Sequence, residues 1–312
     1  MDLLTHGLAG ASIGVATCQL TGDGSVEPAL VASTTIAALL PDLDFIFAIV
    51  KKPILAWRWH RVLLHNIAAV PLLATMVALA AKPFTDETSL TCLILLNTLA
   101  LVSHLVLDLL TSFPTGVLFP FTEKRFAWGT HFLTDPLIGV LLAASLVQSL
   151  TFWMLGLLGV YLIAAVLLKQ MAKQTAIQWQ EQQGLTNKPV HLRPRALAPW
   201  QWLAIIEDET EYIFNYVTPM TSGSTQRTSR GIETRAARLY QNDELLQYFV
   251  KLADFPRFED SQREDKPAIV VEDIQWWWKL PYRPMAISAV LDSKEVPCDA
   301  RESYKFSTSP TG

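Results

Sequence analysis

Histidine and aspartate residues recur in the first half of the chain at spacings that place them side by side on helices. His104 and Asp108 are four residues apart, and so are His131 and Asp135, so each pair lies on one face of a helix. Imidazole nitrogens and carboxylate oxygens are ligands of zinc and similar divalent ions. Such an ion lowers the pKa of the water it binds to about 7 and so supplies a nucleophile at neutral pH.

Further residues of these two types lie close by in the sequence. Asp42 and Asp44 follow Pro41, which we expect to kink or end the helix before it. The remaining candidates are His6, His60 and His65. Together they exceed what one four-coordinate zinc ion uses, which leaves open two ions, or one ion with outer carboxylates that orient its ligands. Arg61, next to His60, has the charge to stabilise an anionic transition state.

The part of the chain that must position these residues has the composition of a membrane protein. The 312 residues are 51% hydrophobic and 17% charged, with a net charge of -4 and a mean hydropathy of +0.27, whereas a soluble domain carries about 25% charged residues. Between residues 88 and 122 the only charged residue is Asp108, and between 126 and 168 it is Asp135. A helix that crosses a membrane needs about 20 mostly apolar residues. We expect five to six spans, at about residues 3–20, 29–50, 62–82, 89–112, 132–150 and 151–168.

Basic residues between the expected spans predict their orientation. Lys51 and Lys52 lie between the second and third spans, Lys124 and Arg125 between the fourth and fifth, and Lys169 follows the sixth. The positive-inside rule places all three segments in the cytoplasm. Every histidine and aspartate candidate then falls at the cytoplasmic end of its span. Because ionisable groups inside a membrane cost a few kcal/mol each, this shared location favours a functional site.

The chain after residue 168 has an ordinary density of charge, which predicts a second kind of structure. We expect residues 1–168 to form a mainly helical membrane domain, 169–199 a polar helix and linker, and 200–312 a cytoplasmic α+β domain. The acidic net charge excludes a strongly basic nucleic-acid-binding surface. Three cysteines without a C-x-x-C motif argue against a disulfide framework and against a thiolate zinc site.

Several of these residues also fit purely structural roles. Asp135 precedes Pro136 and would cap a helix there, His131 would only open the same helix, His6 would lie near headgroups, and Arg61 would be a positive-inside anchor. For the whole protein, three alternatives to an enzyme stay open. They are a proton-coupled transporter, which also uses intramembrane aspartates and histidines, a haem protein with two axial histidines, and a membrane scaffold whose tail recruits a partner.

Four motifs resemble the YdjM-like family of inner-membrane proteins, which are interpreted from their motifs as metal-dependent hydrolases. The motifs are THGLAG (5–10), LLPDLD (39–44), HRVLLH (60–65) and SHLVLDLLTSFPTGVLFPFTEKRFAWG (103–129), and the resemblance covers about residues 1–140. It implies a membrane-embedded helical domain and distant kinship to zinc-dependent phospholipase C. It carries the family's motif positions onto His6, Asp42, Asp44, His60, His65, His104 and Asp108. Val62, Leu64 and Asn66 stand where the family has glycine, threonine and serine.

The sequence therefore predicts a multi-pass inner-membrane hydrolase whose site faces the cytoplasm. A metal-bound hydroxide would attack a phosphoester or related ester of a lipid or small molecule. The expected ligands of one or two divalent ions, zinc first, are His6, Asp42, His60, His65, His104 and Asp108. Asp44 or Asp135 would act as general base or orient a ligand, and Arg61 would face the anionic oxygen. No nucleic-acid partner is expected.

Overall fold

The computed structural model describes most of the chain and divides it into two units. The described residues are 1–21, 25–45, 61–85, 88–239, 244–263, 266–276, 286–290 and 305–306. One unit consists of residues 1–170 with 194–200, and the other of 171–193 with 201–312. Of the candidate site residues, His60 lies outside the described residues, and so does the side chain of Asp44.

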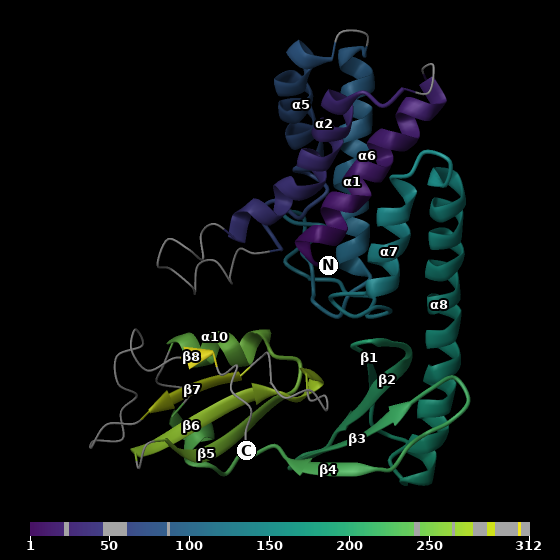
Figure 1. The fold of residues 1–312 in the computed structure, drawn as a ribbon. Helices are drawn as coiled ribbons and strands as arrows, with labels where there is room; N and C mark the ends of the chain where they lie inside the picture. Colours follow the sequence, from purple (N-terminus) through teal and green to yellow (C-terminus); the bar gives the residue numbers. More distant parts are fainter. Residues whose placement is uncertain are drawn as a thin grey trace. The chain divides into compact units, whose positions relative to one another are not determined.

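The first unit is a bundle of apolar helices (Figure 1). Its elements are α1 (Leu3–Thr21), α2 (Pro28–Leu39), the 3₁₀ helix η1 (Leu40–Phe45), α5 (Val70–Ala81), the 3₁₀ helix η2 (Lys82–Phe84), α6 (Leu90–Leu109), α7 (Pro136–Ser145) and α8 (Thr151–Gln182). Three of them, α1, α6 and α8, are long and apolar enough to cross a membrane. The described residues thus contain about three candidate spans, where the sequence predicts five to six.

Prolines and a helix cap account for the shorter helices. Pro28 occupies the first turn of α2, which ends at Leu39 because Pro41 shifts the chain into η1, as expected from its missing N–H. Asp135 caps α7, whose first residue is Pro136. A helix of 12 residues, such as α2 or α5, is about 18 Å long. It is therefore shorter than the hydrocarbon core of a bilayer, which is about 30 Å thick.

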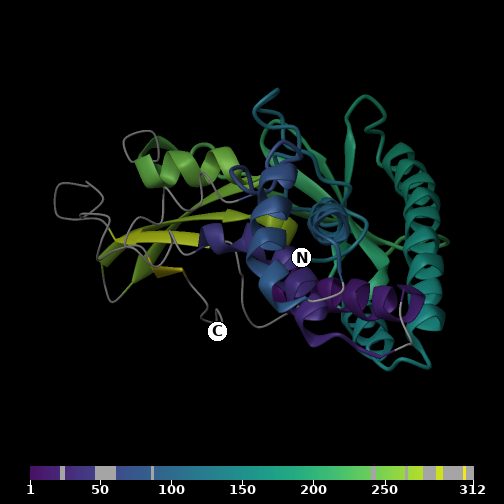
Figure 2. The same cartoon turned by 90° about the horizontal axis from the view of Figure 1, so that it is seen from above.

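Small residues let the first two helices approach closely. Helix α1 packs against α2 and α6, and α5 packs against α6 (Figures 1 and 2). A Cβ atom on Gly10 would lie 2.5 Å from the carbonyl oxygen of Thr34, and one on Gly14 would lie 2.7 Å from the Cα atom of Val31. These two positions of α1 therefore require glycine. The core beneath the contact is formed by Ala37, Ala38, Val70, Leu73, Ala74, Val77, Ala100, Leu101 and Leu105.

Helix α8 turns most of its apolar surface outward. It has 32 residues, and only 11% of its most apolar 18-residue stretch is buried. Val160, Ile163 and Leu167 are among its exposed side chains, as expected of a helix in contact with lipid. The apolar sequence ends at Leu168, and the polar helix expected after it is the continuation of α8 to Gln182.

The described residues of the second unit, with 194–200, form two four-stranded sheets and two short helices. Its elements are β1 (Val190–Arg195), β2 (Ala198–Glu207), β3 (Glu211–Val217), β4 (Gln226–Ser229), α9 (Arg235–Leu239), α10 (Glu244–Leu252), β5 (Pro256–Arg263), β6 (Lys266–Asp273), the 3₁₀ helix η4 (Ile274–Trp276), β7 (Ala286–Val290) and β8 (Lys305–Phe306). The sheet orders are β1-β2-β3-β4 and β5-β6-β7-β8. β2, β3 and β4 pair antiparallel, as do β5 to β8. The expectation of a C-terminal region with both sheets and helices is confirmed.

One strand and the start of another lie where the sequence predicts a linker. β1 and the first residues of β2 lie within 169–199. Pro194 is accommodated because β1 is at the edge of its sheet. The sheets share a core of Leu203, Ile205, Tyr212, Phe214, Phe255 and Ile274.

The close contact of α1 with α2 leads to a stability prediction. We expect Gly14→Leu to lower the stability of the membrane domain by about 1–3 kcal/mol or more, because the new side chain meets the backbone of α2. Gly156→Leu in α8 is the matched control, since no atom lies within 4 Å of the position its Cβ would occupy. The measurement is the thermal midpoint of the full-length protein in detergent. Equal midpoints for the two variants would contradict the close packing of α1 on α2.

Candidate metal centre

Five of the residues singled out from the sequence meet at one end of the helix bundle. His6 comes from the first turns of α1, Asp42 from η1, His65 from the segment before α5, and His104 and Asp108 from the end of α6. The N-terminus marked in Figure 1 lies at this end. The three histidines and Asp108 are 0% exposed, and the side chain of Asp42 is 16% exposed. The bundle therefore encloses a polar cluster within apolar helices.

Two of the histidines lie close to both carboxylates at distances that suit metal ligands. Nε2 of His65 lies 3.2 Å from Oδ1 of Asp42 and 3.6 Å from Oδ2 of Asp108. Nε2 of His104 lies 3.8 Å from each of the same two oxygens. Ligand atoms at the usual zinc distance of about 2.0–2.1 Å stand about 3.3 Å apart in a tetrahedron. Each histidine would thus need only small movements to share an ion with a carboxylate.

The protonation of His104 shows that the cluster fits a cation. Its Nδ1 lies 2.7 Å from the carbonyl oxygen of Ala38. Since a carbonyl only accepts hydrogen bonds, Nδ1 carries the proton and Nε2 carries a lone pair. That Nε2 is buried without a hydrogen-bond partner and faces the carboxylates of Asp42 and Asp108. A cation there would offset the repulsion between the Nε2 lone pair and the carboxylates, and it would give Nε2 a partner. A hydrogen bond from the other ring nitrogen to a carbonyl is usual for metal-binding histidines.

His6 extends the cluster on the other side of Asp108. Its ring stacks on that of His104, with centroids 3.7 Å apart, and its Nε2 lies 3.3 Å from Oδ1 of Asp108. His6, His104 and Asp108 form one possible metal-binding group, and Asp42, His65 and His104 form another. The two oxygens of Asp108 therefore face different histidines, an arrangement that suits one ion or two.

Arg61 contacts Asp108 from a strained backbone position. Its Nη2 donates to Oδ1 of Asp108 at 3.1 Å, and its Nη1 donates to Oγ1 of Thr111 and to the carbonyl of Phe113 at 3.2 and 3.1 Å. The φ angle of Arg61 is 59°, a left-handed conformation that non-glycine residues rarely adopt. The N–H of Gly116 donates to the Arg61 carbonyl at 2.8 Å and helps to hold it. No sequence spacing indicates these long-range bonds.

Asp135 and His131 lie in a separate cluster in the structure. Oδ1 of Asp135 accepts hydrogen bonds from two N–H groups that open α7, which confirms the helix-cap interpretation. Oδ2 accepts from the hydroxyl of Tyr161 at 2.6 Å. His131 bonds to the hydroxyl of Thr130 and lies edge-on to Tyr161. Burial lowers the pKa of His131, so its ring is neutral at pH 7. The sequence does not indicate Tyr161, since only the fold brings α8 to Asp135.

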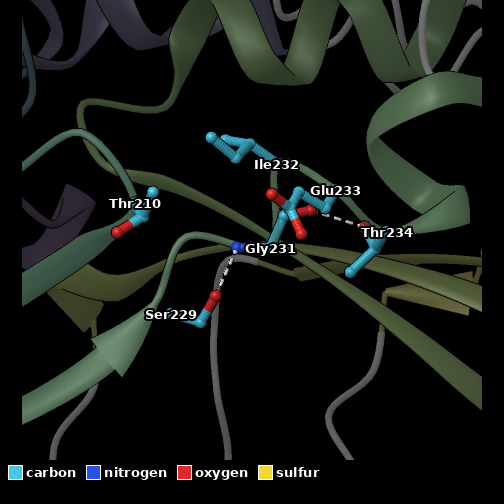
Figure 3. A pocket seen from close by; sticks show the side chains of 6 residues that line it. All are labelled: Thr210, Ser229, Gly231, Ile232, Glu233 and Thr234. Carbon is cyan, nitrogen blue, oxygen red and sulfur yellow. Dashed lines mark hydrogen bonds between the residues drawn. The ribbon is translucent and has the colours of Figure 1, made fainter.

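A pocket of about 520 Å³ lies in the second unit and contains none of the candidate residues. Figure 3 shows its lining, which consists of Thr210, Ser229, Gly231, Ile232, Glu233 and Thr234. The N–H of Gly231 donates to Oγ of Ser229 at 3.0 Å, and Oγ1 of Thr234 donates to the Gly231 carbonyl at 2.6 Å. These two hydroxyls therefore serve the turn itself.

The buried cluster predicts a tightly held metal. We expect the full-length protein, purified in detergent, to contain at least one equivalent of zinc, manganese or iron by elemental analysis. His104→Ala with Asp108→Ala should lose it, because the change removes members of both groups. His191→Ala is the matched control, since His191 lies in β1 against Phe255. A folded wild type that stays metal-free after reconstitution would contradict the site.

Stability gives a second measure of the same site. Removing the metal with a chelator should lower the thermal midpoint of the wild type and of His191→Ala, because a ligand present at 100 times its Kd stabilises the folded state by about 2.7 kcal/mol. The double variant should show no such shift. An equal shift in all three proteins would place the bound metal elsewhere.

The comparisons with known proteins give one relative and one family model, and the family model covers all the candidate site residues. The protein YfhP of Bacillus subtilis (strain 168), described as uncharacterized, is 26% identical over 159 residues. The match covers 50% of this chain and 47% of YfhP, so it spans about half the length of that relative. No solved structure matches. Residues 1–176 match the family model of the YdjM inner membrane protein, and because this is more than half of the chain, the chain belongs to the YdjM family of inner membrane proteins.

Proposed function

We propose that this protein is a membrane-embedded, metal-dependent hydrolase of phosphoesters or related esters. The observation that carries the proposal is the buried, unprotonated Nε2 of His104, which faces the carboxylates of Asp42 and Asp108. Imidazole and carboxylate ligands together suit a divalent ion, zinc first. Membership of the YdjM family and the three candidate spans support a membrane location. The basic residues Lys124 and Arg125 support a site at the cytoplasmic face.

The distances and the family motif together suggest how the ligands would divide. Asp42, His65 and His104 would hold one ion, with Asp108 beside them. His6 and Asp108 would hold a second ion together with His60, which only the motif supports because it lies outside the described residues. A divalent ion supplies a nucleophile at neutral pH, because it lowers the pKa of a water molecule that it binds to about 7. The burial of the cluster strengthens every charge interaction within it, since few water molecules screen the charges.

Two further aspartates of the sequence, Asp44 and Asp135, are candidates for the general base. The carboxylate of Asp135 already accepts three hydrogen bonds, two from N–H groups of α7 and one from the hydroxyl of Tyr161, in a cluster separate from the metal centre. We therefore assign the base to Asp44, two residues after Asp42, and assign to Asp135 the positioning of α7. Asp44 would take a proton from the attacking water, and the leaving ester oxygen would gain a proton to become an alcohol.

Arg61 would act on charge in two ways. Its bond to Asp108 offsets part of the negative charge of the carboxylates. The same guanidinium, fixed by Thr111 and Phe113, would stabilise negative charge that develops on the ester oxygens. A proton-relay transporter has less support, because the five clustered residues gather at one end of the bundle and do not cross the membrane midplane.

The test is hydrolysis of bis(p-nitrophenyl) phosphate, p-nitrophenyl phosphate and p-nitrophenyl acetate by the metal-loaded, full-length protein. We expect zinc- or manganese-dependent turnover of at least one ester, with no turnover by His104→Ala. Asp44→Asn should lower kcat by about 10²–10⁴-fold, the usual contribution of a general base, at unchanged metal content. His191→Ala should match the wild type.

Two results would contradict the proposal. One is a fully metal-loaded wild type that hydrolyses none of the three esters. The other is turnover that persists in His104→Ala, which would place the reaction outside the cluster. Full activity in Asp44→Asn would contradict the assignment of Asp44 as the base, while the proposed hydrolase function would still stand.

A further inference from the structure

The segment that follows α6 forms a fixed loop, residues 113–129. Thr115 and Phe126 exchange backbone hydrogen bonds of 2.9 Å in both directions. The N–H groups of Trp128 and Gly129 donate to carbonyls at the end of α6, at 2.6 and 3.0 Å. The loop therefore holds its side chains in place without a helix or a long strand.

This fixed loop presents a group of large apolar side chains to its surroundings. Phe121 is 79% exposed and Trp128 is 51% exposed, and Leu118 and Phe126 are exposed as well. Lys124 is exposed among them. Single exposed apolar residues are ordinary, but four within 11 residues of one rigid loop indicate a surface that meets an apolar partner.

The ends of two candidate spans give the depth of the loop. The mostly apolar helix α6, 20 residues long, ends at Leu109, four residues before the loop starts. The apolar part of α8 ends at Leu168, and the ammonium group of the next residue, Lys169, contacts the backbone carbonyl of Trp128. Both spans therefore reach the boundary of the hydrocarbon core at the level of this loop. Tryptophan and lysine are enriched at that level of membrane proteins.

The loop is also joined directly to the metal centre. The Phe113 carbonyl accepts a hydrogen bond from Nη1 of Arg61, and the N–H of Gly116 donates to the Arg61 carbonyl. Nη2 of the same arginine binds Asp108. The backbone at the start of the loop therefore lies against the arginine that binds Asp108.

We infer that the 113–129 loop inserts into the headgroup layer of the leaflet at its own end of the bundle, with Phe121 and Trp128 among phospholipids, and that the metal centre takes a phospholipid phosphoester from that layer. The first part stands on the loop and the span ends alone. The second part rests on the proposed hydrolase function, and it narrows the substrate class from phosphoesters in general to those of membrane lipids.

The depth of the loop can be measured without any activity. The full-length protein, with Cys18, Cys92 and Cys298 replaced by alanine, receives one cysteine at a time and a fluorescent label. Phe121→Cys tests the loop, Leu157→Cys on the exposed face of α8 is the lipid control, and Ile232→Cys, an exposed apolar residue of the second unit, is the solvent control. In phosphatidylglycerol nanodiscs, the quenchers are lipids with a nitroxide near the headgroup, and iodide in the water.

We expect the label at 121 to be quenched by the nitroxide lipid, as at 157, and to be shielded several-fold from iodide compared with 232. Quenching at 121 by iodide alone would show a loop in water and overturn the inference. Quenching by neither reagent would show that protein covers the loop, and would overturn it equally.

A second experiment tests the delivery of lipid to the site. Phe121→Ser with Trp128→Ser should lower hydrolysis of phosphatidylglycerol in vesicles several-fold, while hydrolysis of soluble bis(p-nitrophenyl) phosphate stays at the wild-type rate. Equal losses on both substrates, or no loss on the lipid, would overturn the lipid-delivery part. A wild type that hydrolyses neither substrate defeats the proposed function, and the quenching experiment then still decides where the loop lies.

Discussion

A carboxylate enclosed by apolar helices must be matched by positive or hydrogen-bonding groups, because burying it alone costs many kcal/mol. Asp108, 0% exposed near the end of α6, imposes this requirement on the bundle. One of its oxygens meets Arg61, His6 and the amine of Met1, and the other faces His65 and His104. These partners come from three separate stretches of the chain, residues 1–6, 61–65 and the end of α6, so the burial of one side chain ties α1 and the segment before α5 to α6.

Several irregular features of the bundle then have one physical cause. The early end of α2, the 3₁₀ helix that carries Asp42 and the left-handed backbone of Arg61 are each unfavourable or unusual by themselves. Each one brings a polar group to the end of α6. The glycines of α1 act in the same sense, since the close approach of α1 to α2 carries His6 onto the ring of His104. The backbone departs from regular helix geometry around the polar cluster, whereas α8, which faces outward, is a continuous helix.

Local sequence rules predict the features that depend on neighbouring residues. The four-residue spacing of His104 and Asp108, the helix end near Pro41 and the cap at Asp135 follow from backbone geometry and appear in the structure. The expected span count is too high, because apolar runs continue through prolines and caps that end the helices inside them. The bond of Tyr161 to Asp135 depends on contacts across 26 residues, which no local pattern encodes. Strand β1 escapes prediction because its proline indicates a connection unless the strand is known to be at an edge.

The helix end at Pro41 also determines the tautomer of His104, which lies on another helix. In a 3₁₀ helix the carbonyl of Ala38 would accept the N–H three residues later, and that residue is Pro41, which has none. The carbonyl is thus left to accept the Nδ1 proton of His104, 66 residues further along the chain. That bond leaves Nε2, on the opposite edge of the ring, directed toward the carboxylates of Asp42 and Asp108. Pro41 therefore determines which ring nitrogen of His104 carries the proton, because it leaves the Ala38 carbonyl free to accept from Nδ1.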